Sequence, residues 1–216
     1  MKPTFVLYFC VLSFTLSFGQ DQKQILADIK SKYSLIRELV DNNTLRQYHT
    51  DYTCEESLEK GAITFYYNSR ELKHIIHQYT QGHVSYKDEY YIWDDQLFFE
   101  FSIHKVKYKD YEKNRKKRIE KVDVVLTLEE RFYFDNFVPI KCQFKDFETR
   151  SNRIKNPKTN YVRNQTTDCD QSSRIIEKYY ILLEYQDLDI VDACALPRSI
   201  SKIVSDDIIY SSLGKN

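Results

Sequence analysis

Glycine, proline and methionine are scarce in this chain of 216 residues, which has four glycines, four prolines and one methionine. So few glycines leave little material for a glycine-rich phosphate-binding loop, and no such loop is present. The sequence also lacks the patterns C-x-x-C, G-x-S-x-G and H-E-x-x-H. It therefore gives no support to a zinc knuckle, a thioredoxin-type redox pair or the common hydrolase motifs, and we expect no cofactor.

An excess of charge of one sign is also missing, because 32 basic residues balance 32 acidic residues. No overall field attracts nucleic acid or a membrane surface, so we expect no nucleic-acid partner. Aromatic residues are abundant instead, with 18 tyrosines and 13 phenylalanines, and they favour strands. This composition predicts a soluble, folded, strand-rich domain.

Residues 1–20 are typical of a secretory signal peptide. Met1-Lys2 gives a positive start, residues 5–18 are almost entirely apolar, and cleavage is expected near Gly19 or Gln20. A membrane anchor is the alternative, but the apolar run is shorter than the about 20 residues that span a bilayer. We therefore expect an exported protein, periplasmic or extracellular, without a transmembrane span, in which residues 21–216 form one domain.

Export affects the interpretation of the cysteines. Cys10 leaves with the signal peptide, and Cys54, Cys142, Cys169 and Cys194 remain. An even number in an oxidising compartment predicts two disulfides, with three possible connectivities. We prefer Cys142 with Cys169, because the long polar segment between them needs a constraint, which leaves Cys54 with Cys194. Two free, buried thiols stay open as the alternative for the second pair.

The periodicity of apolar residues predicts an α+β fold: an N-terminal helix, an antiparallel meander of about five to seven strands, and a C-terminal helix packed on the sheet. We expect helices at residues 22–42 and from 172 to about 188–191, and a long surface loop at 145–171. The meander core is residues 61–144. The expected strands are residues 45–52 (weak), 61–67, 72–79, 83–93, 96–108, 122–134 and 137–144. The pattern assigns no structure to residues 192–216.

Two irregularities interrupt the alternation. Apolar residues hold odd positions from 97 to 103 but even positions at 106 and 108, which predicts a β-bulge near His104-Lys105. Asp88 falls among the apolar positions of its strand, so we expect that part of the strand to protrude beyond the core or to carry a bulge.

Candidate reactive groups are few. His74 and His77 lie three apart on an expected strand, where side chains point to opposite faces, so they are not expected to share a metal ion. Asp94-Asp95 falls at an expected hairpin tip, where aspartates are common because they tolerate the turn backbone and are well solvated. We therefore predict no catalytic and no metal-binding residues, and a carboxylate-dependent hydrolase around Asp94 is the least favoured alternative.

Two surfaces are candidates for binding. Aromatic residues on the polar side of the strands could stack on sugar rings or contact a protein, unless helices cover both faces and make them core; these are Tyr91, Trp93 and Tyr133. A basic run could contact anionic headgroups or polysaccharide, or could be a solvated loop; it comprises Lys113, Arg115, Lys116, Lys117 and Arg118.

The motifs YYIW at 90–93, LFFEF at 97–101 and ERFYF at 130–134 resemble a loose group of uncharacterised secreted bacterial proteins. That group shares a signal peptide ending in Gly-Gln, an early helix and repeated hairpins. The resemblance covers about residues 61–144 and implies fold and export but no activity. We expect a non-enzymatic exported binding or envelope-associated protein that acts through its sheet face or long loop, on a glycan or another exported protein. The alternative is an inhibitor or immunity-type protein that acts through a protein interface.

Overall fold

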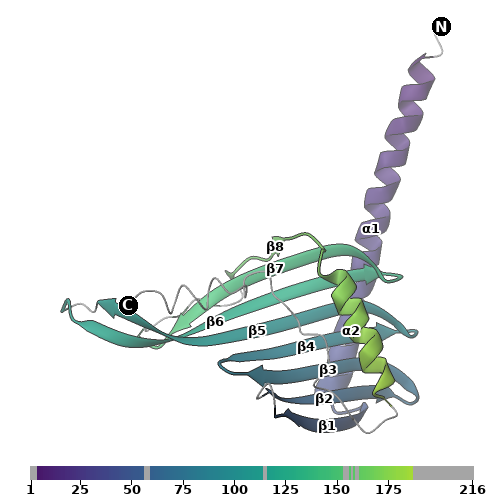
Figure 1. Cartoon of the computed structure of the whole chain (residues 1–216). Coiled ribbons are helices and arrows are strands. Elements are labelled where there is room, and N and C mark those ends of the chain that lie inside the picture. The colour runs from purple at the N-terminus through teal and green to yellow at the C-terminus, as the bar shows by residue number, and fades with distance from the viewer. Residues whose placement is uncertain are drawn as a thin grey trace.

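The computed structural model contains one antiparallel sheet with a helix on each face (Figure 1). The backbone is described for residues 4–55, 59–113, 116–152, 156, 158 and 161–186, and side chains within these ranges from residue 22 onward. The elements are α1 (Thr4–Asp41), β1 (Arg46–Cys54), β2 (Glu59–Asn68), β3 (Glu71–Gln81), β4 (Val84–Trp93), β5 (Gln96–Lys113), β6 (Ile119–Asp135), β7 (Val138–Arg150), β8 (Gln165–Thr166) and α2 (Ser172–Glu184). The predicted α+β class is confirmed.

The sheet is a simple meander, in which each strand pairs with the next one in the sequence from β1 to β8. Tight polar turns make this possible. Asp94 and Asp95 have positive φ angles of 49° and 60°, the backbone that a two-residue hairpin between twisted strands requires. The long β5–β6 hairpin extends beyond the other strands (Figure 1).

Helix α1 covers one face of the sheet, which we call the α1 face. Ile29 and Ile36 are buried there with Tyr91 and Phe99. The first half of α1 projects away from the sheet and contains the predicted signal peptide, which stays a prediction (Figure 1). Within the described residues, no helix has the length and apolar character needed to cross a membrane.

Helix α2 covers the opposite face, which we call the α2 face. Tyr179 and Leu182 are buried with Ile75 and Tyr90 in the largest apolar cluster. The predicted disulfide between Cys142 and Cys169 is present, with Cα atoms 5.5 Å apart, and it links β7 to the chain that enters α2. Cys54 is buried at the end of β1, whereas Cys194 lies outside the described residues, so their pairing stays a prediction.

Three expectations need correction. Residues 145–150 continue β7, and β8 also falls in the segment expected to be a loop. The register shift of β5 lies between Leu97 and Phe99, not at His104-Lys105, because Phe98 is the residue without a partner in the register and all three apolar side chains are buried. Asp88 neither protrudes nor bulges, since it is fully buried in regular pairing.

Candidate functional site

The carboxylates considered for catalysis lie on a solvent-exposed turn. Asp94 and Asp95 form the β4–β5 reversal, and both side chains are exposed. An exposed turn supplies no apolar surroundings to raise the pKa of a carboxyl group for acid–base work. The geometry therefore gives the hydrolase alternative no support at this position.

The H-x-x-H pair is divided between the two faces, as strand geometry predicts. His74 stacks on Tyr91 on the α1 face, with ring centroids 4.2 Å apart. His77 lies on the α2 face, where its Nε2 is 2.7 Å from the hydroxyl of Tyr52. The two rings therefore cannot bind one ion.

The aromatic candidates lie on the α1 face, largely beneath the helix. Tyr91 is fully buried and its ring lies 4.9 Å from that of Tyr33, so it is core and not an exposed binding surface. Trp93 is half-buried, with the Lys73 ammonium 4.2 Å from its ring centroid. Tyr133 lines a small apolar cavity of about 180 Å³ beside α1. The alternative that a helix covers these rings is correct for Tyr91.

The basic run lies at the end of the projecting hairpin. Lys113 ends β5, and Lys116, Lys117 and Arg118 are exposed before β6 begins. Arg115 lies outside the described residues. The described members are thus exposed to solvent.

The α2 face contains a buried ion pair that the sequence analysis missed. The Nζ of Lys178, on α2, lies 2.7 Å from Oδ2 of Asp88, on β4, and both residues are at most 2 % exposed. His77 and His104 flank Asp88 on β3 and β5, and Nε2 of His104 lies 3.7 Å from Oδ1 of Asp88. Burial alone would raise the pKa of the Asp88 carboxyl, but Lys178 and His104 outweigh burial and hold that pKa well below its ordinary value.

The next residue repeats the arrangement on the opposite side. Glu89 faces α1, where its Oε2 accepts a hydrogen bond of 2.5 Å from Tyr91 and lies 3.8 Å from the guanidinium of Arg37. Burial raises the pKa of Glu89, but the neighbouring His74, Lys87 and Tyr91 lower it to about 2. Consecutive carboxylates of the central strand therefore each tie one helix to its face of the sheet.

A second buried carboxyl lies near Asp88. Glu100 is fully buried, and its Oε1 accepts a hydrogen bond from the hydroxyl of Ser102. Burial and the neighbouring Asp88 charge raise the pKa of Glu100 well above its ordinary value, which favours the protonated form of this carboxyl group. These groups have the perturbed pKa values of a reactive site, but a substrate reaches them only if α2 moves.

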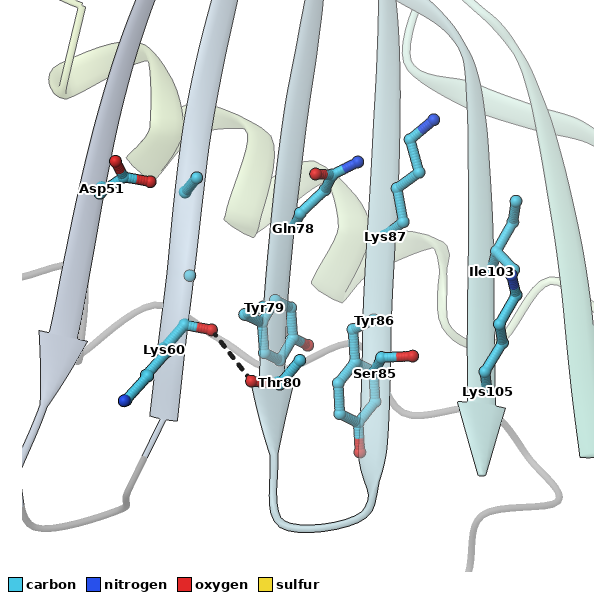
Figure 2. A pocket seen from close by; sticks show the side chains of 12 residues that line it. Asp51, Lys60, Gln78, Tyr79, Thr80, Ser85, Tyr86, Lys87, Ile103 and Lys105 are labelled. Atoms are coloured by element: carbon cyan, nitrogen blue, oxygen red, sulfur yellow. Dashed lines mark hydrogen bonds between the residues drawn. The ribbon is translucent and has the colours of Figure 1, made fainter. Parts of the chain in front are cut away.

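Among the described residues, a wide concavity lies on the α1 face, in the part that α1 leaves uncovered. It is a groove of about 510 Å³ over β2 to β5, with one lining residue on β1, and no residue of α1 lines it (Figure 2). We call it the sheet groove. Its floor includes one small apolar side chain, one amide and two hydroxyls, from Ala62, Gln78, Thr80 and Ser85. Its charged lining residues are Asp51, Lys60, Lys87 and Lys105.

The register explains why these groups meet. Thr80 pairs with Ser85, and Ser85 pairs in turn with Lys105, so all three lie in one row across the sheet. Alternate residues of a strand share a face, which places Gln78 and Lys87 in the adjacent row. The groove therefore presents hydrogen-bonding groups and three ammonium groups beside the carboxylate of Asp51, a combination suited to binding.

No protein-family model, curated protein or solved structure matches this chain. We therefore infer the function from the residues on the two faces of the sheet.

Proposed function

We propose that this chain is an exported, non-enzymatic binding protein that holds its ligand in the sheet groove. Export is supported by the signal-peptide pattern of residues 1–20 and by the disulfide between Cys142 and Cys169, since such bonds persist in oxidising compartments. The ligand is a glycan or another exported molecule.

The proposal rests on the difference between the buried carboxyl groups and the groups that line the sheet groove. The carboxyl groups with strongly shifted pKa values, Asp88, Glu89 and Glu100, are buried beneath helices, where they fix the fold. The sheet groove is lined by amide, hydroxyl and ammonium groups together with one carboxylate, Asp51, and several apolar side chains. Such groups orient and hold a ligand through hydrogen bonds and charge, as in other concave binding sites.

A blocking variant tests the proposal. The protein from residue 21 onward is tested on an array of neutral and charged glycans, beside Ser85→Trp, which places a large side chain in the groove. Tyr180→Trp serves as the control, because Tyr180 is exposed on α2, on the opposite face. We expect binding by the wild type and the control and loss of binding by Ser85→Trp. Equal binding by all three proteins would place the site elsewhere.

A protein partner is the second candidate, favoured by two large apolar side chains on the projecting hairpin. Tyr111 and Ile119 are 66 % and 70 % exposed. Exposed apolar groups of this size favour protein contacts. The protein should then recover a stoichiometric partner from the native exported fraction, and Tyr111→Ser/Ile119→Ser should lose it.

A further inference from the structure

Along the projecting part of β5, the charges are sorted by face. Lys105, Lys107 and Lys109 alternate along β5, are exposed, and lie on the same face as the sheet groove. Asp110 and Glu112 follow on the opposite face. A protein with no net charge thus presents a row of ammonium groups on one side of a single strand.

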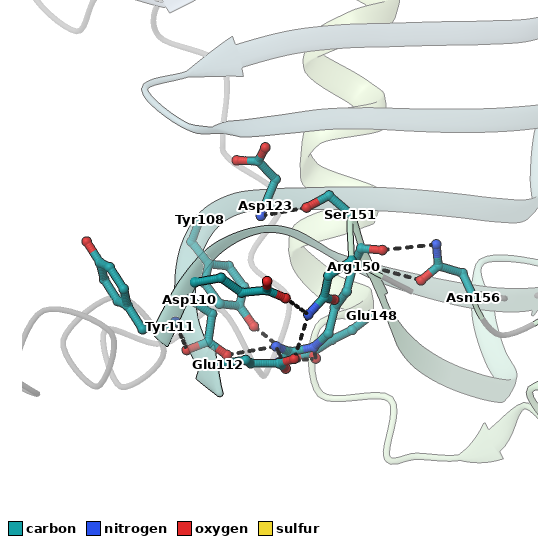
Figure 3. Close-up of polar contacts among 11 residues, drawn as sticks. Tyr108, Asp110, Tyr111, Glu112, Asp123, Glu148, Arg150, Ser151 and Asn156 are labelled. Atoms are coloured by element: carbon teal, nitrogen blue, oxygen red, sulfur yellow. Dashed lines mark hydrogen bonds and ion pairs between the residues drawn. The ribbon is translucent and has the colours of Figure 1, made fainter. Parts of the chain in front are cut away.

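An arginine holds the acidic groups on that opposite face (Figure 3). Arg150 of β7 reaches across β6 and donates to Asp110 Oδ2 at 2.8 Å, and it also pairs with Glu112. Its Nη2 lies 2.9 Å from Glu148 Oε2. Three carboxylates therefore surround one guanidinium and stay on the α2 face, away from the lysine row.

Much of the lysine charge is available to a ligand. Within the described part of the chain, Lys60, Lys105 and Lys107 have no ion pair with a carboxylate within 4.0 Å, whereas Lys109 pairs with Asp123 and Lys87 with Glu89. Successive lysines on one face of a strand are about 6.8 Å apart, so the row presents evenly spaced charges.

We infer that the sheet groove and the β5 lysine row together bind the chain of an acidic polysaccharide, an inference that rests on the proposed binding function. Lysine ammonium groups match the carboxylate or sulfate groups of such a chain, and Gln78, Thr80 and Ser85 match sugar hydroxyls. Tyr111, exposed on the face of the lysine row, offers a ring on which a sugar stacks. The concave groove admits a polymer chain, whereas a flat bilayer would not enter it.

The test compares fluorescently labelled polygalacturonate oligomers with neutral dextran and with phosphatidylglycerol vesicles. The triple variant Lys60→Gln/Lys105→Gln/Lys107→Gln should bind polygalacturonate about tenfold more weakly than the wild type, and wild-type binding should weaken as salt is added. The control Lys23→Gln/Lys158→Gln/Arg174→Gln removes the same charge from other exposed positions and should bind as the wild type does. Circular dichroism confirms that each variant is folded.

Other outcomes separate the two proposals. Equal binding of dextran and polygalacturonate, lost in Ser85→Trp, would keep the groove as a glycan site and overturn the acidic specificity. Binding to vesicles without binding to polygalacturonate would overturn the polysaccharide inference in favour of a membrane surface. Wild-type affinity in the lysine triple variant would overturn it as well. Absence of binding to every probe would overturn both proposals.

Discussion

Removal of the buried charge beneath α2 should be among the most damaging single changes to this fold. Asp88→Asn keeps the shape of the side chain but deletes the carboxylate that lies 2.7 Å from the Lys178 ammonium. Breaking a buried pair by removal of one partner costs about 3–5 kcal/mol, because the other charge loses its compensation in a medium of low polarity. Total domain stabilities are about 5–15 kcal/mol, so we expect a large loss.

Urea unfolding at pH 7, followed by the fluorescence of Trp93, measures this loss. Trp93 is the single tryptophan of the chain. Lys178→Met alone should cost a similar amount, whereas Asp88→Asn/Lys178→Met should return to within about 1 kcal/mol of the wild type, since it buries no charge of the pair. Asp146→Asn changes an exposed aspartate on the same face and should have an effect within about 0.5 kcal/mol. A cost below about 1 kcal/mol for Asp88→Asn would refute the role of this pair in holding α2.

Three further predictions concern the fold. Glu100 has a raised pKa, so its contribution to stability should be full below the ordinary glutamate pKa of about 4.3 and should be lost as pH rises above it; Glu100→Gln should flatten that slope in urea titrations. Gly61→Ala should cost about 1–3 kcal/mol, because the added Cβ would lie 2.5 Å from the Tyr52 ring, and unchanged thermal unfolding would contradict this contact. Loss of the disulfide in Cys142→Ser/Cys169→Ser should lower stability by about 3–4 kcal/mol, estimated from the chain entropy of a loop with a sequence separation of 27, and an unchanged urea midpoint would argue against it.

The strands were predictable because a single rule, alternation, operates without interruption over most of the meander. Residues 122–134 show it most clearly, and they fall within β6. Prediction failed where a buried position is polar. Asp88 has its partner on α2, 90 positions away, so no local pattern indicates that its charge is neutralised. The lysine at position 178, within an apolar helix, was the available sequence sign of a buried ion pair. It identifies Asp88 as its partner only when the position of the helix on the sheet is known.

The sheet groove was only partly predictable. The alternating lysines at 105, 107 and 109 indicate one cationic face of a strand, a pattern visible in the sequence. Their position beside Ser85 and Thr80 depends on the register of three strands and on the bulge at Phe98, which shifts the alternation of β5. Register depends on pairing between strands, and the position of the bulge was not evident from residue types alone.

Mapping of amide chemical shifts in the ¹⁵N-labelled protein, titrated with polygalacturonate oligomers, tests the central claim that the uncovered sheet face is the functional surface. The account predicts shifts that grow with ligand concentration at Gln78, Thr80, Ser85 and Lys105, with residues of α2 unchanged. Shifts concentrated around Lys178 and the outer surface of α2, with the groove unchanged, would contradict it.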